Sequence, residues 1–209
     1  DLYRLRDMFG GISIEFLPIP AVWAEAVPGG LDIENAFLVD IGLSSTLLLL
    51  IKDRRIIHFS SFPFGVGRFI DRIAAFQHVS PEEAEDILRQ YVHQWFTESV
   101  KTPYLSVFKE AADEWKREIV RELDSFYHFG FLPADIILAG GGGYIPELRS
   151  VFTESEVFRH YDNEHPLRIK LFAGSAVFGG DTVNGALGGC EDAGIASLVF
   201  YSLNHRPLF

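Results

Sequence analysis

The spacing of apolar residues at the start of the chain predicts one strand and one helix. Residues 12–17 alternate between apolar and polar side chains, and residues 21–27 form a short helical pattern that Pro28-Gly29-Gly30 closes. A single strand and a single helix cannot bury their apolar faces alone. They either pack on the remainder of the chain or belong to a preceding lobe, and we expect residues 1–34 to be the tail end of such a lobe.

Three short apolar runs come next and predict three consecutive strands. They lie at residues 36–39, 46–51 and 56–59, and only the turn Lys52-Asp53-Arg54-Arg55 separates the second from the third. Connections this short permit only antiparallel hairpins. Because the first two runs are apolar on both faces, we expect the sheet to be covered on both sides.

The middle of the chain changes to the spacing of three or four residues that is typical of helices. Residues 67–77 are the first candidate, Ser80-Pro81-Glu82-Glu83 is a capping-box start for the second, and a third helix spans about 103–127. The stripes predicted to face the core are Ala84, Ile87, Leu88, Tyr91, Val92 and Trp95 in the second helix, and Leu105, Phe108, Ala112, Trp115, Ile119, Leu123 and Phe126 in the third.

The last third of the chain returns to strands, which now alternate with helices. A buried-type strand at 135–139 runs into the glycines 140–143 and a helix at 144–148, and a strand at 167–172 precedes a final helix at 193–203. Hairpin-linked strands followed by alternating helices and strands predict an α/β domain with a mixed sheet and right-handed crossovers.

Charge and cysteine content exclude several classes of function. The 18 Lys and Arg residues against 29 Asp and Glu residues give a net charge of −11, which is unsuited to binding nucleic acid or an anionic membrane. Cys190 is the only cysteine, so an intrachain disulfide and a CxxC zinc site are excluded, and we expect a cytoplasmic protein. The longest aliphatic run, residues 47–51, is far too short to insert into a bilayer.

The turn between the first two strands, residues 40–46, has a composition suited to phosphate. Its small residues leave consecutive backbone N–H groups exposed, and these groups together with three hydroxyls can surround phosphate oxygens. Asp40 would repel phosphate unless a cation lay between them, and Mg²⁺ prefers several waters beside one or two carboxylates. The alternative is a plain β-hairpin in which Asp and Gly serve only the turn geometry.

The second turn of interest is the glycine run 140–143. Glycine permits positive φ and a close approach of ligand to backbone, and a following helix favours an anion at its amino terminus. The run is neither a GxGxxG fingerprint, because Ile145 stands where the last glycine would be, nor a P-loop, because no Gly-Lys-Ser/Thr follows. A flexible strand-to-helix connection is the alternative.

These two turns, with helices between them, resemble the layout of one lobe of the actin-like ATPases. Residues 37–53 followed by 62–65 are similar to the phosphate-2 segment of the type IV pilus assembly family PilM, of which the cell-division family FtsA is a relative with more glycines. Residues 80–88 resemble the helix that contacts ribose in that family, and residues 136–142 resemble its adenosine motif. Residues 11–27 are similar to the segment that precedes phosphate-2 in PilM.

The resemblance implies a fold and a domain division. The fold is an RNase H-like α/β lobe, with a mixed five-stranded sheet, flanking helices and an inserted helical subdomain. Residues 35–209 would form this second lobe, and the helical subdomain would span about 67–129.

The same resemblance implies that the protein binds ATP or ADP with Mg²⁺. Asp40 would orient a water on the metal, and Glu85 would touch the ribose. Gly42, Ser44, Ser45 and Thr46 would hold the terminal phosphates, and Gly141, Gly142 and Gly143 would pass along the sugar and the α-phosphate, with Gly140 in the same nucleotide-binding set.

Several positions depart from the pattern of the family. Leu43 stands where glycine or alanine is usual, Leu47 where an acidic residue is found in FtsA, and Leu88 where the ribose helix has lysine. The first phosphate loop of the family has no counterpart in residues 1–34. We therefore expect only the second lobe, with no catalytic residue of its own and weak hydrolysis that would need the other lobe.

The function that the resemblance implies is that of a nucleotide-binding scaffold for a membrane-associated assembly, most simply in type IV pilus biogenesis. Its partner would be the cytoplasmic tail of a bitopic inner-membrane protein, which would place it in the cytoplasm at the membrane periphery, and self-association is a further expectation. The alternatives are an FtsA-like role in cell division, a small-molecule kinase of the same superfamily, and an interaction module whose site has decayed.

Two other segments carry weaker signals. Residues 160–165 gather metal-capable side chains without a regular spacing, which favours a solvated loop. Residues 178–185 are consistent with a plain loop or a flap whose turn is Asn184-Gly185.

Overall fold

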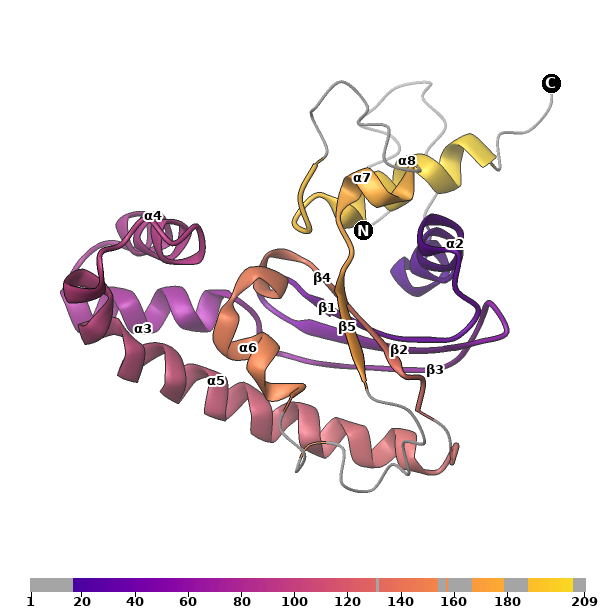
Figure 1. Cartoon of the computed structure of the whole chain (residues 1–209), viewed down its shortest axis with the longest axis horizontal. Coiled ribbons are helices and arrows are strands. Elements are labelled where there is room, and N and C mark those ends of the chain that lie inside the picture. The colour runs from indigo at the N-terminus through magenta and orange to yellow at the C-terminus, as the bar shows by residue number, and fades with distance from the viewer. Residues whose placement is uncertain (1–16, 131, 154–156, 158–166, 179–187, 205–209) are drawn as a thin grey trace, which may run out of the picture.

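The computed structural model describes residues 17–130, 132–153, 157, 167–178 and 188–204. A five-stranded sheet with the order β3-β2-β1-β4-β5 lies at the centre of this part, with helices on both sides (Figure 1). The predicted mixed five-stranded α/β lobe is therefore confirmed. Residues 12–16 of the expected first strand, residues 160–165 and most of 178–185 lie outside the described residues.

The sheet combines a hairpin-linked half with a parallel half. β1 (Ala36–Ile41), β2 (Thr46–Lys52) and β3 (Arg55–Phe62) are antiparallel neighbours, as their short connections predict. β4 (Asp135–Ala139) pairs with β1 in parallel, and β5 (Arg168–Leu171) pairs with β4 in parallel. The two central strands, β1 and β4, therefore come from distant parts of the chain and end at the same edge of the sheet.

Helices of three chain regions surround the sheet. The first region is α2 (Ile19–Leu31). The second region, for which the name helical subdomain is kept, comprises α3 (Gly67–Gln77), α4 (Pro81–Val92) and α5 (Glu98–Tyr127). The remaining elements are the 3₁₀ turn η1 (Gly141–Tyr144), α6 (Pro146–Val151), α7 (Gly174–Val177) and α8 (Ala193–Asn204).

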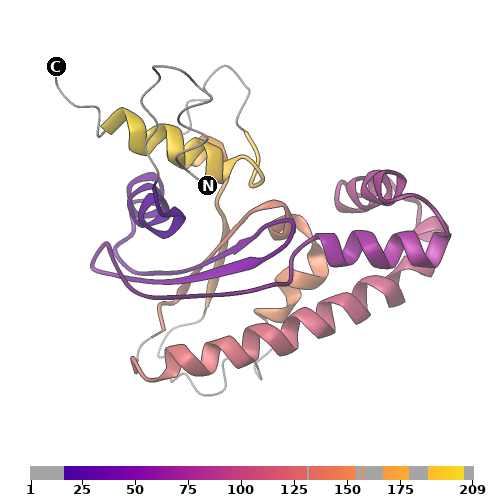
Figure 2. The same cartoon turned by 180° about the vertical axis from the view of Figure 1, so that it is seen from behind.

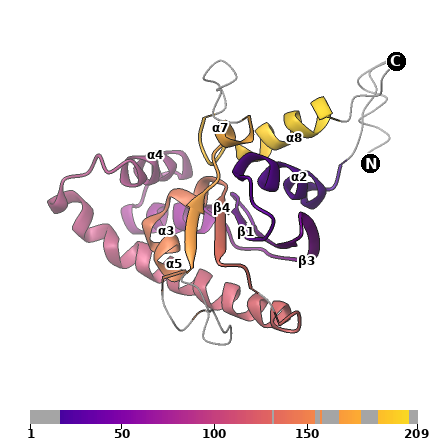
Figure 3. The same ribbon diagram turned by 45° about the vertical axis from the view of Figure 1, so that its right-hand side comes forward.

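The two faces of the sheet are covered by different helices, as the apolar strands predict. On one face, α3, α5 and α6 contribute to the larger core cluster together with Phe37, Val39 and Leu48. On the other face, α2, α7 and α8 pack over Leu38 and Leu49. The two layers are visible on opposite sides of the sheet in Figures 2 and 3.

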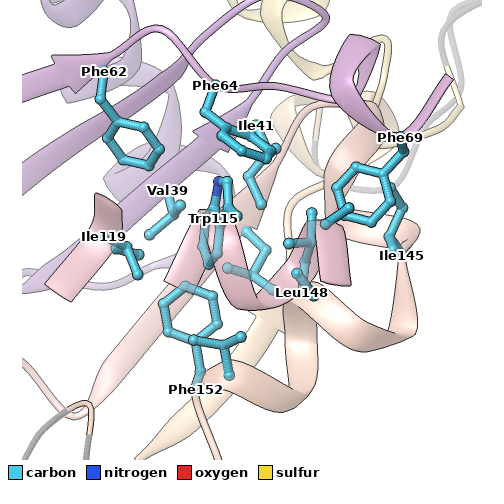
Figure 4. Packing of buried hydrophobic residues seen from close by; sticks show 14 of the residues in the cluster. Val39, Ile41, Phe62, Phe64, Phe69, Trp115, Ile119, Ile145, Leu148 and Phe152 are labelled. Atoms are coloured by element: carbon cyan, nitrogen blue, oxygen red, sulfur yellow. The ribbon is translucent and has the colours of Figure 1, made fainter. Parts of the chain in front are cut away.

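Trp115 of α5 joins the larger cluster to the start of β2. Its ring is fully buried, contacts Phe152 edge to face at 5.7 Å between centroids, and lies 6.1 Å from Phe62 (Figure 4). Its indole Nε1 donates a 2.9 Å hydrogen bond to Thr46 Oγ1, and that hydroxyl donates a 2.7 Å bond to the carbonyl of Phe64. The long helix is therefore tied by polar contacts to the strand that follows the first turn.

The first helix is longer than the sequence predicts. Pro28-Gly29-Gly30 does not close it, because α2 continues to Leu31 and ends only at Asp32, which adopts left-handed φ and ψ of 49° and 52°. Pro28 is buried in the last turn of the helix, where its own carbonyl still accepts from the backbone amide of Asp32. Gly30 lies so near α7 that an added Cβ would be 2.8 Å from the carbonyl oxygen of Ala176, so tertiary packing overrides the usual helix-breaking signal.

The second helix of the helical subdomain ends earlier than the sequence predicts. α4 ends at Val92, not at Trp95, because Gln94 takes a left-handed φ of 59°. Trp95 is 67% exposed and stacks on His93, so it is not part of the core.

The long helix and the helix after the glycine run begin elsewhere than expected. α5 starts at Glu98 and contains Pro103 in its second turn, and Tyr104 is buried where Leu105 was expected, since Leu105 is 42% exposed. The helix predicted at 144–148 is divided into η1 and α6, because Pro146 lacks an amide and suits the first position of a new helix.

Candidate functional site

The two turns that the sequence singles out lie side by side at one edge of the sheet. Asp40 near the end of β1 is paired with Ala139 at the end of β4, so the chains leaving both strands emerge together. Gly140 has φ 75° and ψ 168°, and a Cβ added to it would lie 2.4 Å from the carbonyl oxygen of Ile41 and 2.6 Å from Asp40 Oδ1. The first glycine of the run is therefore required where the two turns touch.

The other glycines of the run have different environments. Gly142 is buried, and a Cβ there would lie 2.2 Å from Ile41 Cγ2, whereas Gly143 packs near Leu138 without overlap. Gly141 has open space around its Cα, with no atom within 4 Å of an added Cβ. Gly141 is thus the glycine whose backbone a ligand can approach, while Gly142 serves close packing.

The first turn offers exposed backbone donors. The turn is closed by a hydrogen bond of 3.0 Å from the amide of Gly42 to the carbonyl of Ser45. The amides of Val66 and Gly67 donate to the carbonyls of Gly42 and Leu43 at 2.9 and 2.8 Å, which fixes the turn from outside. Within the described residues, the amides at positions 43–45 donate to no protein group, and the three residues are exposed. Successive exposed amides of this kind form an anion-binding concavity.

Among the three hydroxyl-bearing residues of the first turn, Thr46 is the one whose hydroxyl lies in the core and not at the surface. Its side chain is fully buried, and its Oγ1 both accepts from Trp115 and donates to the carbonyl of Phe64. Thr46 fixes the base of the turn in the core. The hydroxyl is therefore engaged in the core in this arrangement, and a role of Thr46 in holding phosphate stays a prediction.

Asp40 lies in a setting that disfavours its negative charge. Burial raises the pKa of Asp40 above its usual value, and a hydrogen bond from the side chain of Trp23 offsets part of this rise. Trp23 belongs to α2 and is itself buried against Phe172. A cation beside the carboxylate would compensate for the lost hydration.

A hollow of about 760 Å³ opens where these groups meet. From the predicted set it is lined by Asp40, Gly42, Ser45, Gly140 and Gly141, and from α2 and α8 by Trp23, Ile195 and Leu198 among others. Sequence reasoning missed Trp23 and Glu191, which also line this hollow. The alternation of buried residues in α2 marks Trp23 as a core residue, but nothing in the local sequence directs it to Asp40.

Two further residues of the predicted set border a second hollow of about 490 Å³. Ser44 and Glu85 line it, together with Arg68 from the start of α3. Glu85 is exposed and pairs with Arg89 one turn later in α4 at 3.3 Å. Leu43 lines both hollows and is 67% exposed, so its side chain stands between the glycine turn and Glu85.

Position 88, where the resemblance implies lysine, has a structural role in this chain. Leu88 is 5% exposed and belongs to the larger core cluster with Ala84 and Tyr91. It therefore faces the interior of the helical subdomain. Leu88 supplies no positive charge to a ligand, and Arg68 is the one positive side chain among the described residues that line the second hollow.

Other kinds of site find no support in the described part of the chain. No group of three or more His, Cys, Asp and Glu side chains there is arranged to hold a metal. None of its helices has both the length and the apolar character that crossing a bilayer requires. A single carboxylate next to exposed amides suits a metal that shares its ligands with phosphate and water.

Comparison with solved structures identifies the fold. No family model matches the chain, and neither does any curated protein sequence. The PilM–PilN type IV pilus biogenesis complex contains a chain that is 16% identical with a TM-score of 0.57, and the match covers 90% of this chain and 53% of that one. The ethanolamine utilization protein EutJ from Carboxydothermus hydrogenoformans is 18% identical with a TM-score of 0.52, and the match covers 73% of this chain and 49% of that one.

A third match extends the comparison to a protein with bound nucleotide analogue. MreB5 of Spiroplasma citri bound to AMPPNP is 16% identical with a TM-score of 0.54, and the match covers 97% of this chain and 63% of that one. The chain thus spans about half the length of the PilM and EutJ chains that it matches. At these identities the likeness concerns the fold. The chain therefore has the fold of one lobe of an actin-like ATPase.

Proposed function

We propose that the protein binds ADP or ATP with Mg²⁺ in the hollow where β1 and β4 end. The observation that carries this proposal is the contact between the two turns, which brings the exposed amides at positions 43–45, Gly141 and Asp40 together at one edge of the sheet. Backbone donors can bind the oxygens of a polyphosphate, and a divalent cation held by a carboxylate can neutralise its remaining charge. The MreB5 chains of similar fold are described as bound to AMPPNP and to ADP.

Each group has a defined role in this proposal. The terminal phosphates accept from the amides of the first turn, with the hydroxyls of Ser44 and Ser45 beside them. Gly141 lets the sugar and the α-phosphate approach the backbone, and Glu85 accepts from a ribose hydroxyl. Gly42, Gly140, Gly142 and Gly143 give the two turns the shape that brings these donors together.

Mg²⁺ fits the residues that are present. Asp40 is the buried carboxylate at the contact between the turns, and its raised pKa shows that the negative charge lacks full compensation within the protein. When bound, the metal would neutralise phosphate charge and hold waters. Asp40 would orient one of those waters, and Trp23 would keep the carboxylate in position.

Hydrolysis is expected to be slow. The hollow is open to solvent, and the described residues supply donors from the two turns at one sheet edge only. Phosphoryl transfer depends on charge stabilisation and alignment from several directions and on exclusion of water. The chain spans about half of the matched PilM chain, so activity of a longer protein would need groups from beyond this lobe.

For the cellular role, we propose a nucleotide-responsive scaffold of a membrane-associated assembly, of the kind that PilM represents. Support comes from the fold shared with the PilM chain of the PilM–PilN complex. The proposed partner is the cytoplasmic tail of a bitopic inner-membrane protein, which would hold this protein in the cytoplasm at the membrane periphery. Genes adjacent to the coding sequence distinguish the alternatives, since pilus and cell-division clusters differ in content.

Calorimetric titration of the chain with Mg·ADP and Mg·ATP tests the nucleotide site. We expect saturable heat that falls strongly when Asp40→Asn is used, because the metal loses its carboxylate. Asp113→Asn, on the exposed face of α5, is the matched control and should bind as the wild type does. Absence of both heat and thermal shift at millimolar nucleotide, in this chain and in a longer one, would contradict the proposal. Phosphorylation of an added sugar or acid would instead indicate a kinase.

A further inference from the structure

A hydrogen bond joins the helical subdomain to the segment that follows the glycine turn. Tyr91 of α4 donates through its hydroxyl to Glu147 Oε1, in the first turn of α6. The two helices carry or adjoin different parts of the proposed nucleotide site, since Glu85 lies on α4 and Gly140–Gly143 lead directly into α6. The bond therefore connects the two parts outside the hollows themselves.

Tyr91 is held so that its hydroxyl has little freedom. The ring is 3% exposed and stacks on Phe108, with 3.9 Å between centroids and 15° between planes. Lys101 Nζ lies 5.8 Å from the centre of the ring. Burial, followed by the hydrogen bond to Glu147, raises the pKa of the Tyr91 phenol far above its usual value, so the hydroxyl remains a donor at physiological pH.

Glu147 is held less completely. Its Oε2 is buried and has no hydrogen-bond partner among the described residues, while its Oε1 accepts from Tyr91. A partly buried carboxylate with one unsatisfied oxygen stabilises the folded state less than an apolar pair of similar volume would. A contact serving stability alone would be made better by two apolar side chains. The arrangement is instead suited to a contact that can open, because the carboxylate gains hydration when it leaves.

We propose that Tyr91 and Glu147 form a clasp that sets the spacing between α4 and the glycine turn. This inference rests on the proposed nucleotide site, and it makes both residues positioning residues. With the clasp closed, Glu85 and the glycine turn are held at one separation. Opening of the clasp lets α4 move away from α6 and releases the sugar end of a bound nucleotide.

A substitution that removes one oxygen atom abolishes the hydrogen bond of the clasp. Tyr91→Phe removes the hydroxyl and keeps the ring on Phe108. Tyr104→Phe is the matched control, because Tyr104 is a second tyrosine of the subdomain, 8% exposed, whose hydroxyl makes no hydrogen bond within the described residues. In hydrogen exchange without nucleotide, we expect amides 140–147 to exchange roughly two- to tenfold faster in Tyr91→Phe, as loss of one hydrogen bond implies, and unchanged in Tyr104→Phe.

A second variant separates positioning from stability. Glu147→Met removes the half-satisfied carboxylate and fills similar volume, so we expect an unchanged or higher unfolding midpoint together with the faster exchange of amides 140–147. In the double variant Tyr91→Phe/Glu147→Met the exchange should be no faster than in either single variant, because both act on one contact.

Nucleotide binding provides the last measurement. We expect Mg·ADP affinity to fall roughly two- to tenfold in Tyr91→Phe and in Glu147→Met, and not in Tyr104→Phe. Equal exchange of amides 140–147 in Tyr91→Phe and Tyr104→Phe would overturn the clasp. Faster exchange in Tyr91→Phe, together with a wild type that binds no nucleotide, would retain the clasp as a mechanical link and overturn the nucleotide site. Faster exchange with unchanged affinity would overturn the positioning role.

Discussion

Gly140 and Gly141 are adjacent residues for which the structure predicts opposite responses to the same substitution. Gly140 combines φ 75° with ψ 168°, a region that only glycine occupies readily, and placing another residue there costs on the order of 1–3 kcal/mol. The added methyl group would also overlap the carbonyl oxygen of Ile41, at 2.4 Å, and backbone cannot move aside as a flexible side chain can.

Backbone strain and steric overlap together should make Gly140→Ala lose about 3 kcal/mol or more of the free energy of unfolding. For a chain of 209 residues this lowers the melting temperature by about 6–12 °C, at roughly 2–4 °C for each kcal/mol. Gly141→Ala meets no atom within 4 Å, so we expect its stability to stay within about 0.5 kcal/mol of the wild type.

Urea unfolding followed by tryptophan fluorescence measures both variants under the same conditions. Gly141 lines the hollow, so its alanine variant should remain folded and yet bind Mg·ADP more weakly. Equal unfolding midpoints for the two variants, or a lower midpoint for Gly141→Ala, would refute the close contact between the turns.

Three further substitutions examine the same region. Leu43→Ala removes the side chain between the two hollows, so we expect Mg·ADP affinity to rise severalfold in calorimetry. Asp40→Asn should raise the urea midpoint at pH 7, because the raised pKa of Asp40 means that folding disfavours the charged form. Trp115→Phe leaves the buried hydroxyl of Thr46 without its donor and should lower the free energy of unfolding by about 1–3 kcal/mol in the same assay.

Each of these expectations has a control. Leu105→Ala shortens another exposed leucine, and an equal gain in affinity there would contradict the role of Leu43. The benefit of Asp40→Asn should vanish below pH 3.8, where the carboxyl is neutral in both the folded and the unfolded wild type, so a constant benefit across pH would point to another cause. A Trp115→Phe variant that is as stable as the wild type would show that the hydroxyl of Thr46 needs no donor.

Local sequence patterns predict most of the fold because they reflect burial that the structure retains. Residues 36–39 of β1 are all apolar, and both faces of this part of the strand are covered. Ser80 and Glu83 form the reciprocal cap that the spacing predicts at the start of α4. These features depend on residues a few positions apart, which a sequence displays directly.

The predictions fail where distant contacts decide. Pro28-Gly29-Gly30 remains helical because α7 packs on Gly30, and Trp95 lies outside the core because the chain turns at Gln94. In the candidate site, the sequence brings the two turns together only through the resemblance to a known fold. The capture of the Thr46 hydroxyl by Trp115 depends on a partner 69 residues away, and no local pattern reveals it.

The parallel pairing of β1 with β4 has a consequence for the order of folding. Phe37 meets Ile136 only after the chain has closed a loop that contains the whole helical subdomain, whereas the β1–β2–β3 hairpins need only short connections. We expect the hairpins to acquire protection early in pulsed hydrogen exchange and β4 to acquire it late. A newly synthesised chain would then acquire the proposed nucleotide site only when β1 pairs with β4. Nucleotide binding would therefore indicate that folding is complete.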